Sequence, residues 1–304
     1  MLTIEPGKAI LGAKMTGVDL AQLLADADHA RVLRALGQYG VLCFPNQLID
    51  AAALKQFSSR FGELQVLSRN CEPGMPEVSI LSNVVENGRY IGTPDAGQDW
   101  HTDMTYNLTP GFVNVLVAHK VPMRNGEPLG GTEFTNTQAA YDDLPVDIKT
   151  RLADATALHD WNNFHELMRA KGSKRPPLSA EERRQRPPVS HPVFFTHPIS
   201  GRKVIYVNPG FAVRINELEP GESRDMLDYL FAHVLKPKYR HTHHWTVGDV
   251  LIWDHLGTWH CALADYQPDE LRLMKRCQVL ADKVFDPVFM QARLNAREPA
   301  GMTK

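Results

Sequence analysis

The sequence predicts a mainly β fold with helical additions, of the sandwich or double-sheet jelly-roll kind. Its second half carries several short β-branched and aromatic runs separated by turn residues, which is typical of such folds. No glycine-rich phosphate-binding fingerprint follows any of these runs, which argues against a parallel nucleotide-binding sheet. With 304 residues, 43% of them apolar, the chain can bury a sizeable core, and we expect a single domain over 1–304.

Helices and strands alternate in the first half. Apolar residues at helical spacing predict a helix over 20–38, followed by a short buried strand over 40–45. A second helix is expected over 51–61, with Asp50 placed to cap its start and Gly62 to end it. The next expected elements are a strand over 113–119 and a short helix over 137–144.

Charged residues and prolines dominate residues 159–188, where apolar residues are too few to anchor the chain. We interpret this stretch as a mobile surface loop or lid. A plain solvated insertion is the alternative, and nothing in the sequence separates the two. Strands are then expected over 192–195, 203–207, 250–253 and 275–280, with a helix over 223–234.

Composition excludes several classes of function. The net charge of −2 offers no general attraction for a polyanion, so nucleic acid is a poor candidate partner. No apolar run approaches the ~20 residues that a membrane span needs. The N-terminus lacks the pattern of a signal peptide, and the cysteines are scattered, so we expect a cytoplasmic protein with reduced thiols. These cysteines are Cys43, Cys71, Cys261 and Cys277.

Two distant segments carry candidate metal ligands. His101 and Asp103 are two residues apart, so an extended backbone would point both side chains to one face. His260 follows a strongly apolar strand 159 residues after His101. Two imidazoles and one carboxylate suit a divalent iron with one face left open. A surface His and Asp near a turn is the alternative for the first pair alone.

Other histidines compete for this role. His243 and His244 are adjacent, so an extended backbone points them to opposite faces. We expect these two, His241 and His255 to be non-ligands.

Basic and apolar residues alternate downstream of His260. Arg272 and Arg276 would share one strand face, and arginine holds carboxylates in a bidentate fork. A dicarboxylic co-substrate beside the metal would need such a group. An exposed charged strand is the alternative on spacing alone.

Several short motifs in this order resemble the taurine dioxygenase and 2,4-dichlorophenoxyacetate dioxygenase family of Fe(II)/2-oxoglutarate oxygenases. The resemblance runs from about Gly40 to about Phe285. The motifs are Trp100-His101-Thr102-Asp103, Gly130-Gly131-Thr132-Glu133-Phe134, His191-Pro192-Val193, Thr196-His197-Pro198, Gly201-Arg202-Lys203, Tyr206-Val207-Asn208 and Gly248-Asp249-Val250-Leu251-Ile252-Trp253-Asp254.

The resemblance implies a double-stranded β-helix, a jelly-roll core that holds the metal. It implies that His101, Asp103 and His260 bind Fe(II), and that Thr132 and Arg272 hold the distal carboxylate of 2-oxoglutarate. O2 is the second co-substrate, and a C–H bond of a small organic substrate is hydroxylated with succinate and CO2 as co-products. Family members often form dimers or tetramers, so a homo-oligomer stays open.

The substrate side departs from the taurine enzymes. Leu67 stands where a histidine that helps hold the sulfonate is expected, and Gly97 replaces an expected asparagine. An anionic substrate with a larger or more apolar body than taurine is therefore expected, with Arg276 near its charge. Further candidates for lining this part of the site, for each of which ordinary core packing is the alternative, are Leu67, Tyr106, Tyr90 and Met104.

Two other functions stay open at this point. A zinc hydrolase could use the same three ligands. A jelly-roll protein could instead bind 2-oxoglutarate or another metabolite without catalysis. A binding protein, however, has no need for an iron site with an open face.

Overall fold

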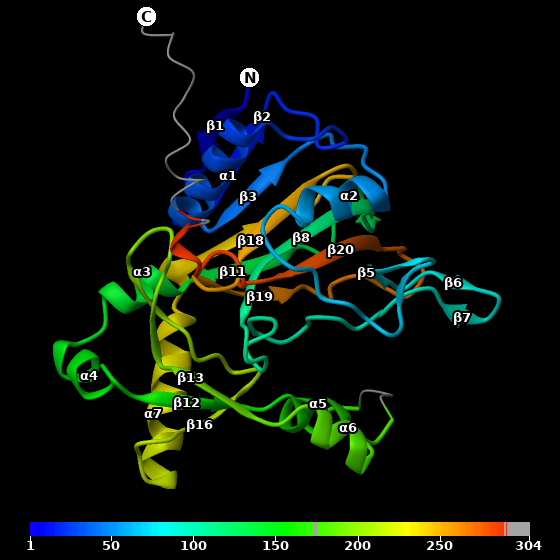
Figure 1. The fold of residues 1–304 in the computed structure, drawn as a ribbon. Helices are drawn as coiled ribbons and strands as arrows, with labels where there is room; N and C mark the ends of the chain where they lie inside the picture. The colour runs from blue at the N-terminus through cyan, green and yellow to red at the C-terminus, as the bar shows by residue number, and fades with distance from the viewer. Residues whose placement is uncertain (173–175, 289, 291–304) are drawn as a thin grey trace, which may run out of the picture.

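The computed structural model describes residues 1–172, 176–288 and 290. Strands outnumber helices, and the largest element is an eight-stranded sheet (Figure 1). Its strands, in spatial order, are β1 (Thr3–Pro6), β2 (Ala13–Thr16), β3 (Val41–Phe44), β18 (Val250–Asp254), β8 (Gly111–Lys120), β20 (Leu273–Leu280), β5 (Met75–Ser82) and β4 (Cys71–Glu72).

A smaller sheet lies against one face of this large sheet. It has the order β17-β11-β19, and its strands are β17 (Arg240–His243), β11 (Thr132–Asn136) and β19 (Thr258–Ala262). Side chains alternate along β8: Val115 and Val117 join one apolar cluster, while Leu116 joins another with Phe134 of the small sheet. The two faces of the large sheet therefore bury separate cores.

Two helices cover the other face of the large sheet, above β18 and β8 in Figure 1. They are α1 (Asp26–Tyr39) and α2 (Ala51–Ser58). The Asp50 carboxylate accepts the backbone N–H of Ala53, so the predicted cap of α2 is confirmed. The predicted helix over 20–38 starts too early, because residues 20–25 form a turn and an extended link, and α1 begins at Asp26.

A second lobe extends below the sheets in Figure 1 and has its own apolar cluster. It contains a three-stranded sheet in the order β13-β12-β16, a β14-β15 hairpin and the helix α7. The elements of this lobe are α3 (Thr137–Asp142), α4 (Val146–Arg151), β12 (Thr156–His159), α5 (Trp161–Ala170), α6 (Ala180–Gln185), β13 (Val189–Pro192), β14 (Phe194–Thr196), β15 (Lys203–Ile205), β16 (Ala212–Ile215), α7 (Pro220–Val234) and the 3-10 helix η1 (Pro237–Tyr239). Two hairpins complete the fold, formed by β6 (Val85–Glu86) with β7 (Arg89–Tyr90), and by β9 (Met123–Arg124) with β10 (Glu127–Pro128).

The stretch predicted as a loop contains two short helices, α5 and α6. Each helix begins at a capping residue: Asp160 accepts the backbone N–H of Asn162, and Ser179 forms a reciprocal capping box with Glu182. Local capping thus gives helical structure to a segment with few apolar residues. Whether the segment acts as a lid stays a prediction.

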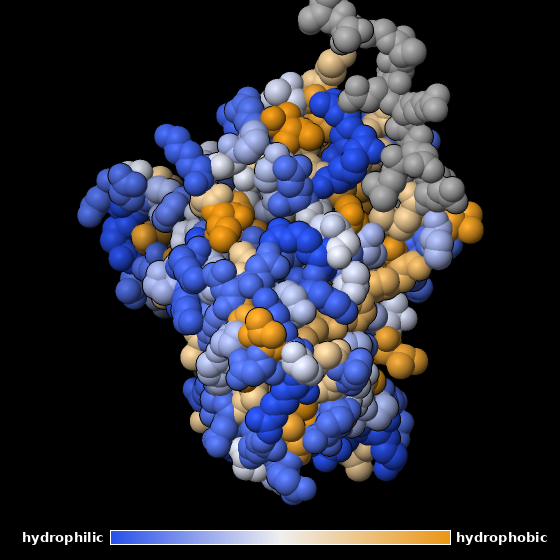
Figure 2. All heavy atoms as spheres, turned by 90° about the vertical axis from the view of Figure 1, so that its left-hand side faces the viewer, coloured by the Kyte–Doolittle hydropathy of each residue, from blue (hydrophilic) through white to orange (hydrophobic). Residues whose placement is uncertain are grey.

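The surface is mostly hydrophilic on the side that Figure 2 shows. The face that carries α4 and α7 is mostly hydrophilic, with small separate apolar patches (Figure 2). Among the described residues, no helix is long and apolar enough to cross a bilayer. The four cysteines are free thiols.

Candidate active site

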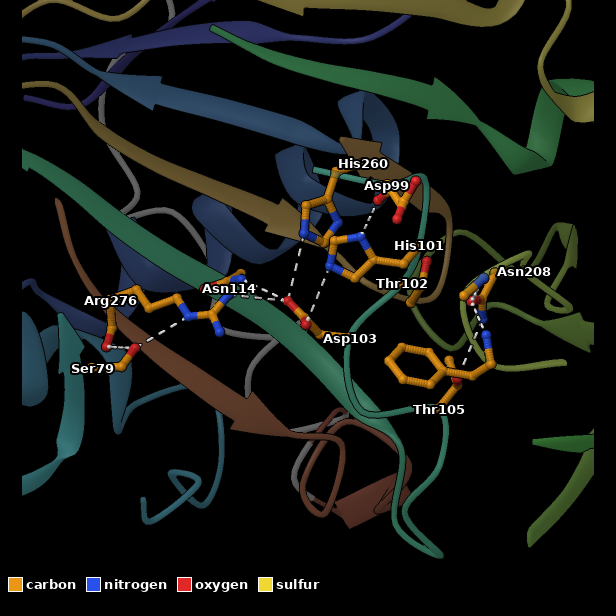
Figure 3. A network of polar contacts seen from close by, with 12 residues as sticks. Ser79, Asp99, His101, Thr102, Asp103, Thr105, Asn114, Asn208, His260 and Arg276 are labelled. Carbon is orange, nitrogen blue, oxygen red and sulfur yellow. Dashed lines mark hydrogen bonds and ion pairs between the residues drawn. The ribbon is translucent and has the colours of Figure 1, made fainter. Parts of the chain in front are cut away.

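The three predicted ligands converge. His101 and His260 form an isolated antiparallel bridge, in which each backbone N–H donates to the other residue's carbonyl, at 3.1 and 2.8 Å. Their ring centroids are 4.2 Å apart. The two Asp103 carboxylate oxygens lie 3.5 Å from His101 Nε2 and 3.5 Å from His260 Nε2, respectively (Figure 3). One ligand atom from each residue thus lies within 4.8 Å of the others, in a buried group that could hold a metal ion.

The local reason for this convergence differs from the prediction. His101 is extended, but Asp103 lies in a turn, and Met104 after it has a left-handed φ of 63°. The Thr102 hydroxyl donates to the carbonyl of Thr258 at 2.7 Å and ties this turn to β19. A turn fixed from the opposite strand, rather than the alternation of a strand, brings Asp103 to the two imidazoles.

The protonation states favour metal binding. His101 Nδ1 lies 2.7 Å from the Asp99 carbonyl, and donation to that oxygen leaves Nε2 with a free lone pair. Burial, assisted by His101, lowers the pKa of His260 to about 3, so its imidazole is neutral. Burial alone would raise the pKa of Asp103, but Arg276 and the two histidines hold it well below its ordinary value. The site therefore presents the neutral imidazole of His260, the accessible Nε2 of His101 and an ionised carboxylate.

Two further side chains contact the Asp103 carboxylate. Asn114 Nδ2 donates to Oδ2 at 3.2 Å, and Arg276 Nη1 donates to the same oxygen at 3.3 Å (Figure 3). Arg276 Nε also donates to the Ser79 hydroxyl at 3.1 Å, which fixes the guanidinium. Asn114 was not predicted from the sequence, although a lone amide inside the apolar strand β8 was a usable signal.

Arg272 is a buried cation without a carboxylate partner. Only 6% of its surface is exposed, its Nε has no hydrogen-bond partner, and no ion pair of this residue occurs in the described part of the chain. Burial lowers its pKa. The side chain passes Gly130, where a Cβ would lie only 3.2 Å from Arg272 Nε, so glycine leaves room for it. An unpaired buried charge is costly, which indicates that an anion belongs beside it.

Thr132 begins β11, two residues after Gly130. Its buried hydroxyl accepts the indole N–H of Trp245 at 3.0 Å. The structure thus places Arg272 against the segment that carries Thr132.

The predicted substrate-side residues are in different environments. The Tyr106 ring packs at a tilt against Phe211, with ring centroids 4.7 Å apart, and burial together with Asp103 raises the pKa of Tyr106 to about 12. Leu67 is half-buried in the connection between α2 and β4, where its backbone N–H donates to Pro76. Tyr90 is 55% exposed in the β6-β7 hairpin, while Met104 is fully buried and packs in the protein interior.

Comparison with known proteins identifies the family. The family model described as taurine catabolism dioxygenase TauD, TfdA family, matches residues 3–278. The chain belongs to the TauD/TfdA family. This TauD/TfdA protein is therefore an oxidoreductase, an Fe(II)- and 2-oxoglutarate-dependent dioxygenase that uses O2. The finding favours the dioxygenase prediction over the zinc hydrolase and the non-catalytic binding protein.

Relatives of this TauD/TfdA enzyme differ in the compounds they are named for. A pentalenolactone F synthase of Streptomyces avermitilis is 31% identical over 300 residues, covering 94% of this chain and 96% of the relative. An alpha-ketoglutarate-dependent 2,4-dichlorophenoxyacetate dioxygenase of Cupriavidus pinatubonensis is 28% identical, covering 92% of this chain and 98% of the relative. Among solved structures, a taurine dioxygenase from Burkholderia xenovorans has a TM-score of 0.74 at 28% identity, covering 92% of this chain and 90% of that one. AAD-2 in complex with Mn(II) and N-oxalylglycine has a TM-score of 0.75 at 25% identity, covering 92% and 97%.

The metal-free protein is expected to lose stability in mild acid. Burial is the main cause that lowers the pKa values of His159, His255 and His260 from 6.5 to about 3, 4 and 3. Below pH 6.5 these histidines bind protons in the unfolded chain but stay neutral in the folded one. The free energy of unfolding therefore falls as the pH falls, until the pKa values of the folded protein are reached. Each group contributes about 1.4 kcal/mol per pH unit in this window. Urea unfolding at several pH values between 7 and about 4.5 measures the slope.

His159→Asn provides the control for this prediction. His159 contacts the Thr105 hydroxyl and is not one of the three proposed ligands, so the variant should lose about 1.4 kcal/mol per pH unit of the slope. A free energy of unfolding that stays constant across the window would show that these histidines are not held neutral.

Proposed function

We propose that His101, Asp103 and His260 bind the Fe(II) of this dioxygenase on one face of the ion. The protonation states, the carbonyl that orients His101 and the 3.5 Å spacing of the donor atoms fit a metal held by two imidazoles and a carboxylate. The decisive observation is that the protein holds both this ligand group and a buried Arg272 that has no carboxylate partner. The pair of features supports a metal and an organic anion bound together.

We assign Arg272 and Thr132 to the distal carboxylate of 2-oxoglutarate. Arg272 supplies a desolvated charge with a free Nε–H, and Thr132 supplies a hydroxyl on the adjacent segment. Asn114 and Arg276 both donate to Asp103 Oδ2 and hold it in place, and Arg276 helps to keep that carboxylate ionised. With Fe(II), 2-oxoglutarate and O2 bound, the site supplies the oxidation that hydroxylates a C–H bond and yields succinate and CO2. The task of the chain is to orient that bond and exclude water.

The finer architecture that we propose is a double-stranded β-helix. The large sheet and the β17-β11-β19 sheet enclose the apolar cluster around Phe134 and Trp253, and the second lobe is an addition to this single domain. His260, at the centre of β19, projects next to Phe134 and Trp253 at one end of that core.

We propose a small organic anion with an apolar body as the substrate. Arg276 adds a positive charge beside the Asp103 carboxylate, in addition to that of Arg272. Tyr106 and Phe211 add aromatic surface near His101. Several relatives are named for aryloxy acids, namely 2,4-dichlorophenoxyacetate and phenoxypropionate. Leu67 and Gly97, which replace polar residues expected in the taurine enzymes, make taurine itself a poor fit.

A substrate screen that follows succinate release tests this function. The protein is given iron, ascorbate, 2-oxoglutarate and O2 with aryloxy acids, sulfonates, sulfate esters and N-modified amino acids. We expect substrate-dependent succinate with at least one organic acid, and little with taurine. Equal turnover of neutral and anionic analogues of one compound would contradict the anionic substrate but not the dioxygenase.

We propose that α5 and α6 form a lid over the site. Lys171 pairs with the Asp99 carboxylate at 2.9 Å, and the Asp99 carbonyl holds His101. Phe164 packs on Phe211 at 4.7 Å, and Phe211 in turn packs on Tyr106. The segment thus contacts the shell of residues around the metal ligands.

Hydrogen exchange tests the lid. Amides in α5 and α6 are expected to become protected when an active substrate binds with 2-oxoglutarate and metal under anaerobic conditions, because closure buries their backbone. Helix α4, which is exposed and lies outside this contact shell, serves as an internal control and should not change. Unchanged exchange in α5 and α6 would identify the segment as a plain insertion.

A further inference from the structure

A second group of metal-ligand side chains lies outside the active site. Cys43 in β3, His243 at the end of β17 and Asp249 just before β18 each offer one donor atom, all within 4.8 Å of one another. His243 Nε2 lies 3.2 Å from Asp249 Oδ2. A tetrahedral zinc ion would separate nitrogen and oxygen ligands by about 3.4 Å, so this pair already has the required spacing.

The unpaired ring nitrogen of His243 indicates that a cation belongs between His243 and Asp249. Nε2 is buried and has no hydrogen-bond partner, although the Asp249 oxygen is close, because the geometry of the contact is not that of a hydrogen bond. A buried ring nitrogen without a partner is costly and calls for an explanation. A cation between the two groups would satisfy both of them.

The surrounding structure holds the donors in place. The backbone N–H of Thr246 donates to Asp249 Oδ2 at 2.9 Å, and the Trp245 ring packs edge-on against His243 at 4.8 Å. Leu251, two residues after Asp249, pairs with Cys43 in the β3-β18 ladder. The donors therefore come from both sheets, and an ion would tie β17 of the small sheet to β3 and β18 of the large sheet.

We infer that Cys43, His243 and Asp249 form a second divalent-metal site, selective for zinc-like ions over magnesium or calcium. A thiolate, an imidazole and a carboxylate are ligands that zinc accepts, whereas magnesium and calcium take oxygen ligands. A thiolate and a carboxylate together balance the two charges of the ion. His243 was expected to be a non-ligand because its neighbour His244 points to the opposite face of an extended backbone, whereas the fold brings Cys43 and Asp249 to His243 from other elements.

The same three residues are a poor catalytic triad. Burial, and then the Asp249 carboxylate, raises the pKa of Cys43 to about 12, whereas nucleophilic cysteines have lowered values. Metal binding must displace this thiol proton, so it should be accompanied by proton release.

Cobalt titration of the full-length, metal-free protein tests this inference, because only the second site offers a sulfur ligand. We expect the wild type to bind two equivalents of Co(II) and to develop a thiolate-to-cobalt charge-transfer band that excess Zn(II) abolishes. Cys43→Ser should lose the band and one equivalent, while Cys71→Ser, which changes another half-buried cysteine of the same large sheet, should retain both. His243→Gln should weaken the affinity for the band-forming ion at least tenfold, and it serves as the second variant if Cys43→Ser fails to fold.

The outcomes separate this inference from the proposed active site. Asp103→Ala should remove the other equivalent and leave the charge-transfer band in place. Absence of the band in the wild type, its persistence in Cys43→Ser or its loss in Cys71→Ser would overturn the second site. A wild-type protein that binds two equivalents with the band, together with an Asp103→Ala protein that still binds two, would sustain the second site and refute the iron ligands.

Discussion

Asp103→Ala is expected to abolish iron-dependent succinate formation. The substitution removes one of three proposed ligands and leaves the Arg276 guanidinium without the carboxylate it contacts at 3.3 Å. Loss of a residue that only supports a ligand typically costs 10–100-fold in metal affinity or activity, so loss of the ligand itself should cost more than about 100-fold. Succinate release and Fe(II) binding, measured on the same preparation, report the two effects.

Asp269→Ala is the matched control, since Asp269 is an exposed aspartate before β20 and outside the proposed ligand group. It should keep wild-type turnover. His101→Ala should behave as Asp103→Ala does. Wild-type succinate production in both ligand variants would remove the basis for the metal assignment.

Arg272→Ala should raise the concentration of 2-oxoglutarate needed for half-maximal turnover. The guanidinium is buried and unpaired, so a bound carboxylate is the group that would satisfy it. A hydrogen bond to a charged group is worth about 1.5–3 kcal/mol, which corresponds to an increase of roughly 10- to 150-fold. The KM for 2-oxoglutarate is the measurement, with kcat followed separately.

Arg89→Ala, in the exposed strand β7, controls for the loss of a positive charge and should not change this KM. Arg272→Lys keeps the charge but not the forked donors, so it should recover part of the affinity. If Arg272→Ala binds 2-oxoglutarate as tightly as the wild type, the anion assigned to this residue binds elsewhere.

Local signals in the sequence predicted much of the secondary structure. Asp50 caps α2 because its carboxylate reaches the N–H of Ala53, a contact that only neighbouring residues determine. The same kind of signal was present at Ser179 and Glu182, where a capping box begins α6. It was outweighed by the charge and proline content of that stretch, so helices were missed where a loop was predicted.

Donor types in the sequence, together with the resemblance of several motifs to a known family, pointed to the proposed ligands. His101, Asp103 and His260 were selected from the sequence, and the structure brings them together. The geometry that does so was not predicted, because the turn at Asp103 depends on a hydrogen bond from Thr102 to Thr258 across the fold. Asn114 was missed for a related reason: its role depends on the strand order that places β8 under the site.

By itself, the sequence determined which residues are candidates for binding a metal and an anion, and where most helices and strands run, because chemistry and local conformational preference belong to each residue and its neighbours. The tertiary structure decided which side chains those residues contact and how deeply they are buried. The unpaired state of Arg272, the neutral form of His260 and the meeting of Cys43 with His243 and Asp249 all follow from burial and from strand order. These properties arise from contacts between segments far apart in the chain, which local pattern does not encode.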